Sequence, residues 1–173
     1  LFLLTAFSFN FATLTKFYNL LAILGAVVAF YGFLQYKGID FLDYANTGLP
    51  VIATLGNSNF ASSFMGFAAI ALLWKITDVK VLWLKVILAV VLVGQTYVIY
   101  ISQSSQGLFI LLIGALTFIG IKFFTLTKKI GVAYFSAFGA ASFLGLLGLF
   151  QIGPLTKFVY QASTTYRGDY YRA

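Results

Sequence analysis

Long uncharged apolar runs are the feature that most constrains what this chain can fold into. They cover residues 17–36, 58–74, 81–102, 107–121 and 130–152. Lys85 is the only charged residue within them, close enough to one end to reach the membrane surface. Each run approaches or exceeds the ~17–25 residues that cross a bilayer as a helix. Because the apolar residues are continuous rather than alternating, we predict an all-α, polytopic membrane bundle with about five full spanning helices.

The composition agrees with this class. The chain is 61% hydrophobic and 9% charged, whereas a soluble domain carries about 25% charged residues. Residues 1–15 are also apolar, and we expect them to be the end of a truncated first helix. Because the chain begins at Leu1 rather than Met, we expect residues 1–173 to be a single transmembrane domain from the middle of a longer protein.

The residue types that are missing exclude several kinds of chemistry. The chain contains no Cys, no His and no Glu. A disulfide framework, a His-based triad and a His-containing zinc site are therefore excluded within it. Asp40 and Asp43 are three residues apart, but metal sites usually need more oxygen ligands than two. We expect no metal and no cofactor.

The basic residues predict which loops share a side of the membrane. If the spans alternate, one side has seven basic residues and one acid, and the other has four basic and three acidic. The positive-inside rule makes the first side cytoplasmic. Residues 37–57, 102–106 and 153–173 then face outward. Because the basic residues are scattered between spans, we expect no nucleic-acid partner.

Two polar stretches on the predicted outward side stand out. The first is TLGNSNF (54–60), where Asn57 and Asn59 flank Ser58 at the start of a span. The second is ISQSSQGLF (101–109), which contains Gln106. Either stretch is explained by helix capping or by a short polar turn, with Ser58 or Asn59 as the cap. The alternative is that their amides and hydroxyls line an outward cavity and bind sugar hydroxyls or phosphate.

The tail TTYRGDYYRA (164–173) carries the only two arginines, Arg167 and Arg172. Guanidinium groups pair bidentately with phosphate and stay protonated. One interpretation is that both arginines are interfacial anchors beside the tyrosines of the tail. The other is that they bind the phosphates of a lipid headgroup or of a lipid-linked pyrophosphate.

Taken in order, three short motifs resemble the superfamily of O-antigen ligases and O-antigen polymerases, which are bacterial membrane glycosyltransferases. GNSNF (56–60) resembles G-N-x-N-F at the start of a span. SQSSQG (102–107) resembles a T/S-x-S-R-G turn, with Gln106 in place of the arginine. RGDYYRA (167–173) resembles R-x-x-x-W-x-A at the entry to the large outward loop, with Tyr171 in place of the tryptophan.

The resemblance implies a reaction on the outer face of the bacterial cytoplasmic membrane. A glycan linked to a polyprenyl pyrophosphate would move to a hydroxyl of a sugar, lipid or protein acceptor. Arg167 would stabilise the pyrophosphate leaving group, and Arg172, Asn57, Asn59 and Gln106 would contact substrate. The general base would come from a histidine in a loop beyond Ala173, so the site in this chain would be incomplete. Ligase, polymerase and protein glycosyltransferase are not separated by these motifs.

Two other functions fit the same spans. A transporter or flippase would explain helices with polar loops, although the chain shows no convincing inverted repeat. A non-catalytic membrane scaffold is also compatible with five spans. Both stay open at the level of the sequence.

Overall fold

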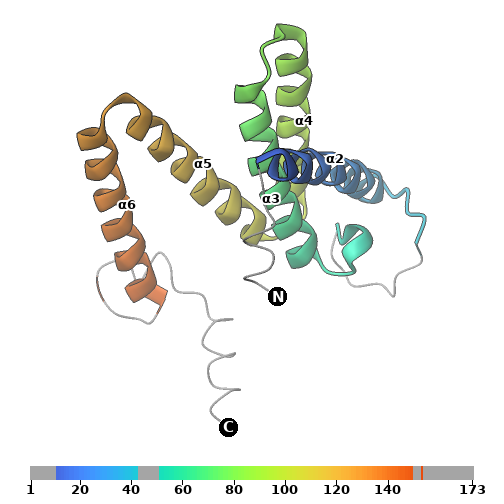
Figure 1. Ribbon diagram of the computed structural model, residues 1–173. Helices are drawn as coiled ribbons and strands as arrows, with labels where there is room; N and C mark the ends of the chain where they lie inside the picture. Colours follow the sequence, from blue (N-terminus) through green and yellow to red (C-terminus); the bar gives the residue numbers. More distant parts are fainter. Residues whose placement is uncertain (1–10, 43–50, 150–152, 154–173) are drawn as a thin grey trace. The chain divides into compact units, whose positions relative to one another are not determined.

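The computed structural model describes residues 11–42, 51–149 and 153 (Figure 1). These residues form five α-helices, a short 3-10 helix and no strand. The helices are α2 (Phe11–Tyr36), η1 (Ala53–Leu55), α3 (Ser58–Asp78), α4 (Leu82–Ile101), α5 (Ser105–Leu126) and α6 (Lys128–Leu149). All five α-helices are long and apolar enough to cross a membrane. The prediction of an all-α, multi-pass membrane fold with five spans is therefore confirmed.

The structure corrects the predicted helix boundaries at three places. Helix α3 continues through Lys75 to Asp78, beyond the predicted end of its span at residue 74. Helix α2 begins at Phe11 and continues through Lys16, so residues 11–15 belong to the first span and not to a separate helix. Helix α5 extends to Leu126 and α6 begins at Lys128, so only Thr127 separates them. The physical reason is the same in all three places. Lysine is a good helix former, and its long side chain can reach water from the end of a span.

Glycine ends the first helix in a regular way. Gly38 has φ of +81°, in the left-handed region that glycine adopts without strain. The N–H of Ile39 donates to the carbonyl of Leu34, and the N–H of Gly38 donates to that of Gln35, both at 2.9 Å. This is a Schellman motif, which satisfies carbonyl groups that the helix leaves free. The chain therefore leaves α2 in a defined direction before residues 43–50, which lie outside the described part.

The chain divides into two compact units, residues 1–118 and 119–173. In the first unit α3 packs against both α2 and α4, and α2 also packs against α4 (Figure 1). The buried face of α3 consists mainly of small residues: Ala61, Ser62, Gly66, Ala68, Ala69 and Ala71. Such residues let helix backbones approach closely, which replaces the hydrophobic driving force that is missing between helices in lipid. Against Ala68 the fit is so close that a Cβ on Gly25 of α2 would lie 2.1 Å from the alanine Cβ.

The first part of α5 runs along α3 in the same direction. Gly107 lies against Ser62, and a Cβ on Gly114 would meet Ile70 at 2.1 Å. Further along, the rings of Trp74 and Phe118 pack edge to face, with centroids 6.0 Å apart. Residue numbers increase together along both helices, so the two are parallel. Two helices separated by one antiparallel helix, α4, are expected to be parallel when spans alternate across a membrane.

The second unit is a helical hairpin in its described residues. The end of α5 and the start of α6 pack through aromatic rings, with Phe124 and Phe135 centroids 5.5 Å apart and Phe123 and Tyr134 centroids 5.3 Å apart. Gly131 lies directly against the Phe124 ring. Most of the remaining surface of α6 is exposed and apolar, as expected for a helix that faces lipid.

Candidate functional site

Two polar stretches that are far apart in the sequence meet at one end of the first unit. The start of α3 carries Asn57 and Asn59. Residues 102–104 join α4 to α5, and Ser105 and Gln106 form the beginning of α5. Ser104 in that connection donates a hydrogen bond to Asn59, which is 45 residues away in the chain. The fold therefore joins the two stretches that the sequence singled out separately.

A series of hydrogen bonds runs through this meeting point in one direction. The N–H of Gly107 donates to Ser62 Oγ at 3.3 Å, and Ser62 Oγ donates to Ser104 Oγ at 2.7 Å. Ser104 Oγ then donates to Asn59 Oδ1 at 2.8 Å. Both serines are buried and Asn59 is half-buried. Hydrogen bonds in series polarise and strengthen one another. This series therefore fixes the Asn59 amide with its oxygen toward the two serines.

Two neighbouring amides are held in the same way. Ser63 Oγ donates to Gln106 Oε1 at 3.1 Å. The N–H of Asn59 donates to Asn57 Oδ1 at 2.8 Å, which caps α3. The oxygens of Asn57, Asn59 and Gln106 are thus all engaged, while none of their NH2 groups donates to another residue in the described part of the chain. We call these three side chains the amide cluster. Their free N–H groups suit phosphate oxygens or sugar hydroxyls.

The backbone on both sides of the amide cluster is shaped by left-handed residues. Gly56 has φ of +68° and ends η1, which lets Asn57 adopt the extended conformation of a cap. Gln103 has φ of +58° in the turn after α4. Ser102 Oγ donates to the carbonyl of Ile99 at 2.6 Å and accepts from the N–H of Ser104 at 3.3 Å. These bonds hold the turn so that Ser104 faces α3.

A second polar group holds the chain that leads into α3. Gln35 Oε1 accepts hydrogen bonds from the N–H groups of Ile52 at 2.7 Å and Ala53 at 2.9 Å. The Gln35 amide nitrogen donates to Asp40 Oδ2 at 2.7 Å, and the Tyr31 hydroxyl donates to Asp40 Oδ1. The hydrogen bond from Gln35 has the larger effect and that from Tyr31 the smaller, and together they hold the pKa of Asp40 below its ordinary value. Ala53 has φ of +48°, a strained conformation that the Gln35 contact helps to maintain.

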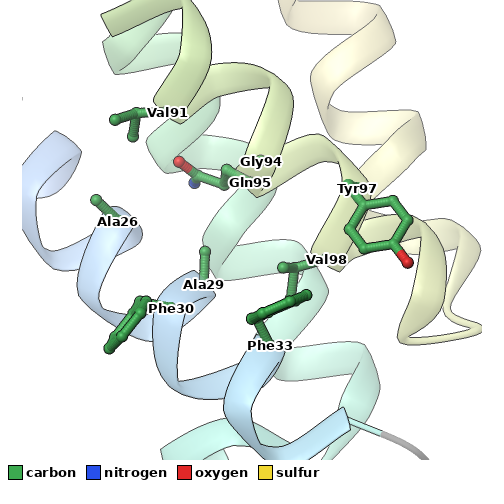
Figure 2. Close-up of a pocket in the computed structure, with 9 residues that line it drawn as sticks. All are labelled: Ala26, Ala29, Phe30, Phe33, Val91, Gly94, Gln95, Tyr97 and Val98. Atoms are coloured by element: carbon green, nitrogen blue, oxygen red, sulfur yellow. The ribbon is translucent and has the colours of Figure 1, made fainter. Parts of the chain in front are cut away.

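An apolar cavity of about 360 Å³ lies between α2 and α4. Figure 2 shows Ala26, Ala29, Phe30 and Phe33 on one side and the α4 residues around Gln95 on the other. Gln95 is buried, and its amide nitrogen donates to the carbonyl of Met65 at 2.6 Å. Its Oε1 has no hydrogen-bond partner among the described residues. The neighbouring helix α3 therefore satisfies the nitrogen of the Gln95 amide but not its oxygen.

The predicted site residues fall into two groups. Asn57, Asn59 and Gln106 lie together where the start of α3 meets the start of α5. Arg167 and Arg172 lie outside the described residues, as does Asp43. The cap of α3 is Asn57, not Ser58 or Asn59, because Asn57 is the last extended residue before the helix.

Sequence reasoning missed Ser62 and Ser63, the partners of the turn residues. Both lie inside an apolar span, where small residues are common packing elements. The available signal was their spacing from Asn59, because residues three and four apart share a helix face. Among the described residues, no three His, Cys, Asp or Glu side chains come together as metal ligands do.

Comparison of the chain with protein families, curated proteins and solved structures gives no significant match.

Proposed function

We propose that this protein transfers a polyprenyl-pyrophosphate-linked glycan to an acceptor hydroxyl at the outer face of a bacterial cytoplasmic membrane. The observation that carries the proposal is the amide cluster, in which hydrogen bonds hold the oxygens of three neighbouring amides and leave their NH2 groups without a partner among the described residues. A site that binds both a sugar and a pyrophosphate needs several fixed donors and no carboxylate near the phosphates. The resemblance of GNSNF and SQSSQG to the O-antigen ligase and polymerase superfamily points to the same reaction.

The apolar cavity between α2 and α4 is consistent with a lipid-linked donor. Phe33 and Val98, which line it, lie in the last turns of α2 and α4. The amide cluster lies beyond the same end of α4. An isoprenoid chain in this cavity would therefore place its pyrophosphate toward the amide cluster. The cavity is apolar except for the Gln95 amide, as a hydrocarbon chain requires.

The proposal gives Arg167 the role of stabilising the leaving group. Negative charge develops on the pyrophosphate as the glycosidic bond to it breaks, and a fixed guanidinium lowers the energy of that transition state. Arg172 is the second cationic candidate. This assignment rests on the resemblance of residues 167–173 to the family motif.

The test is glycan transfer in proteoliposomes that contain a polyprenyl-pyrophosphate-linked glycan and an acceptor saccharide. Formation of a new glycosidic bond and release of polyprenyl pyrophosphate are measured together. We expect Asn59→Asp to lower the rate about 10- to 100-fold, because it keeps the oxygen that Ser104 binds but replaces the free NH2 group by a negative charge. We expect Arg167→Ala to lower it by a similar factor or more.

Matched variants make the result specific. Ser105→Ala changes an exposed neighbour of the amide cluster, and Lys157→Ala removes another cation of the same C-terminal segment; both should keep normal transfer. Movement of the lipid-linked glycan across the bilayer without a new glycosidic bond would identify a transporter and overturn the proposal. Normal transfer by Asn59→Asp and Arg167→Ala would remove both residues from the site.

A further inference from the structure

A second cavity lies where α2 begins and α3 ends, away from the amide cluster. It has a volume of about 160 Å³ and is lined by Thr15, Tyr18 and Asn19 of α2 and by Ala71, Trp74, Lys75 and Asp78 of α3. One water molecule needs roughly 10–15 Å³ of this kind of space. The cavity is therefore large enough for a polar group of many atoms.

Four polar side chains of this cavity, those of Tyr18, Asn19, Lys75 and Asp78, do not bind one another. Lys75 and Asp78 are three residues apart on α3, a spacing that normally brings side chains together. Yet neither side chain has an ion pair or hydrogen bond in the described part of the chain, and the same is true of the Tyr18 hydroxyl and the Asn19 amide. One cavity thus contains a cation, an anion and two neutral hydrogen-bonding groups that have no partner among the described residues.

The depth of the cavity is indicated by Trp74. Its side chain is 43% exposed and stands in the last turns of a span that ends at Asp78. Tryptophan at the end of a span favours the level of the lipid headgroups. Lysines are concentrated at this end of the first unit, with Lys16 on α2, Lys75 on α3 and Lys80 directly after α3. The ligands available at that depth are lipid headgroups and small soluble phosphates.

We propose that this cavity binds a phosphate–ammonium zwitterion, the headgroup of phosphatidylethanolamine. Lys75 pairs with the phosphate, and the Asp78 carboxylate accepts hydrogen bonds from the primary ammonium. Asn19 and the Tyr18 hydroxyl supply further donors to phosphate oxygens. This arrangement discriminates among lipids because the quaternary ammonium of phosphatidylcholine has no N–H to donate, and phosphatidylglycerol has no cation for Asp78.

The first experiment uses the fluorescence of Trp74. The chain has two tryptophans, so Trp83→Phe leaves Trp74 as the only one. The variant is placed in phosphatidylcholine vesicles that contain a small, equal mole fraction of brominated phosphatidylethanolamine or brominated phosphatidylcholine. We expect stronger quenching by the ethanolamine lipid. Asp78→Asn and Lys75→Ala should each lower the apparent affinity for it about tenfold, since each removes one charge-assisted pair.

Controls separate the headgroup site from general effects. Lys80→Ala removes an exposed cation that does not line the cavity, and it should leave the preference for phosphatidylethanolamine intact. Circular dichroism checks that each variant keeps its helices.

Soluble phosphoethanolamine is added in a parallel series. Competition by it at concentrations comparable with the lipid would assign the site to a free phosphate compound instead. Equal quenching by the two brominated lipids, or an unchanged preference in Asp78→Asn, would overturn the proposal.

Discussion

At the scale of single residues, the orientation of Asn59 in the amide cluster depends on one buried hydroxyl, that of Ser104. Ser104 accepts a hydrogen bond from Ser62 and donates one to Asn59, so it links the two halves of the network. It is 5% exposed and water does not readily replace it. The orientation of the Asn59 amide, and hence of its free NH2 group, follows from this single side chain.

Replacing Ser104 should therefore destabilise the protein more than its small size suggests. Ser104→Ala leaves the buried Ser62 hydroxyl without its best acceptor and Asn59 Oδ1 without its donor. We expect a loss of about 1–2 kcal/mol in the free energy of unfolding. Thermal unfolding in detergent micelles measures it, with the exposed Ser105→Ala as the matched control. Equal unfolding midpoints for the two variants would show that the network does not stabilise the fold.

Asp40 should make the stability of the first unit depend on pH. Because hydrogen bonds from Gln35 and Tyr31 lower its pKa in the folded state, its contribution is fully present above the ordinary value of 3.8. That contribution is lost as the pH falls through the lowered, folded-state pKa. We expect the wild-type unfolding midpoint to exceed that of Asp40→Asn at neutral pH, and the gap to close in acid. A gap that is constant with pH would contradict the role of the carboxylate charge.

At the scale of helices, the contact between α3 and α5 is set by glycine. A Cβ on Gly107 would lie 2.2 Å from the carbonyl oxygen of Ser62, and a Cβ on Gly66 would lie 2.7 Å from the carbonyl oxygen of Gly107. Both obstacles are backbone atoms, which cannot move aside as a side-chain tip can. The close approach also lets the Gly107 N–H reach Ser62 Oγ, so the packing of the helices and the polar network depend on the same residue.

Gly107→Ala is therefore expected to separate the start of α5 from α3. Overpacking of this kind typically costs about 1–3 kcal/mol, and the loss of the Gly107–Ser62 hydrogen bond adds to it. Thermal unfolding and helix content are the measurements. Gly94→Ala is the matched control on α4, because a Cβ there meets nothing within 4 Å. Equal unfolding midpoints for Gly107→Ala and Gly94→Ala would contradict the close approach of α5 to α3 at Gly107.

At the scale of the whole chain, the five spans predict which segments reach each side of the membrane. The chain has no Cys, so single-cysteine variants report accessibility without background. We expect Thr54→Cys and Ser105→Cys to react with a membrane-impermeant maleimide from one side. Lys80→Cys and Thr127→Cys should react only from the other. Labelling of Lys80→Cys and Ser105→Cys from the same side would contradict an odd number of crossings between them.

Much of the fold could be predicted from the sequence because lipid leaves few alternatives. An unbroken apolar run in a bilayer must satisfy its own backbone hydrogen bonds, and a helix does so within the segment. The number and approximate limits of the spans followed from this requirement. The errors occurred at Lys16, at Lys75 and at residues 122–129, where a charge was taken to end a helix. The membrane surface lets a lysine stay in a helix, so charge alone does not place the boundary.

The candidate site was predictable only in part. Asn57, Asn59 and Gln106 were recognisable as polar residues at the ends of spans, but Ser62 and Ser63 resembled ordinary packing residues. Gln35 also gave no signal, although it holds the backbone of Ile52 and Ala53 from 17 and 18 residues away. Each of these partners is defined by a contact that is distant in sequence.

The sequence by itself determined the class of this protein, its five spans and the polar residues at their ends, because hydrophobic length and backbone hydrogen bonding are local properties. Only the tertiary structure decided that Asn59, Ser62 and Ser104 form one network with free amide N–H groups beside it. A hydrogen bond forms over about 3 Å, and residues 45 apart come that close only where the small side chains of α3 and Gly107 let two helix backbones nearly touch.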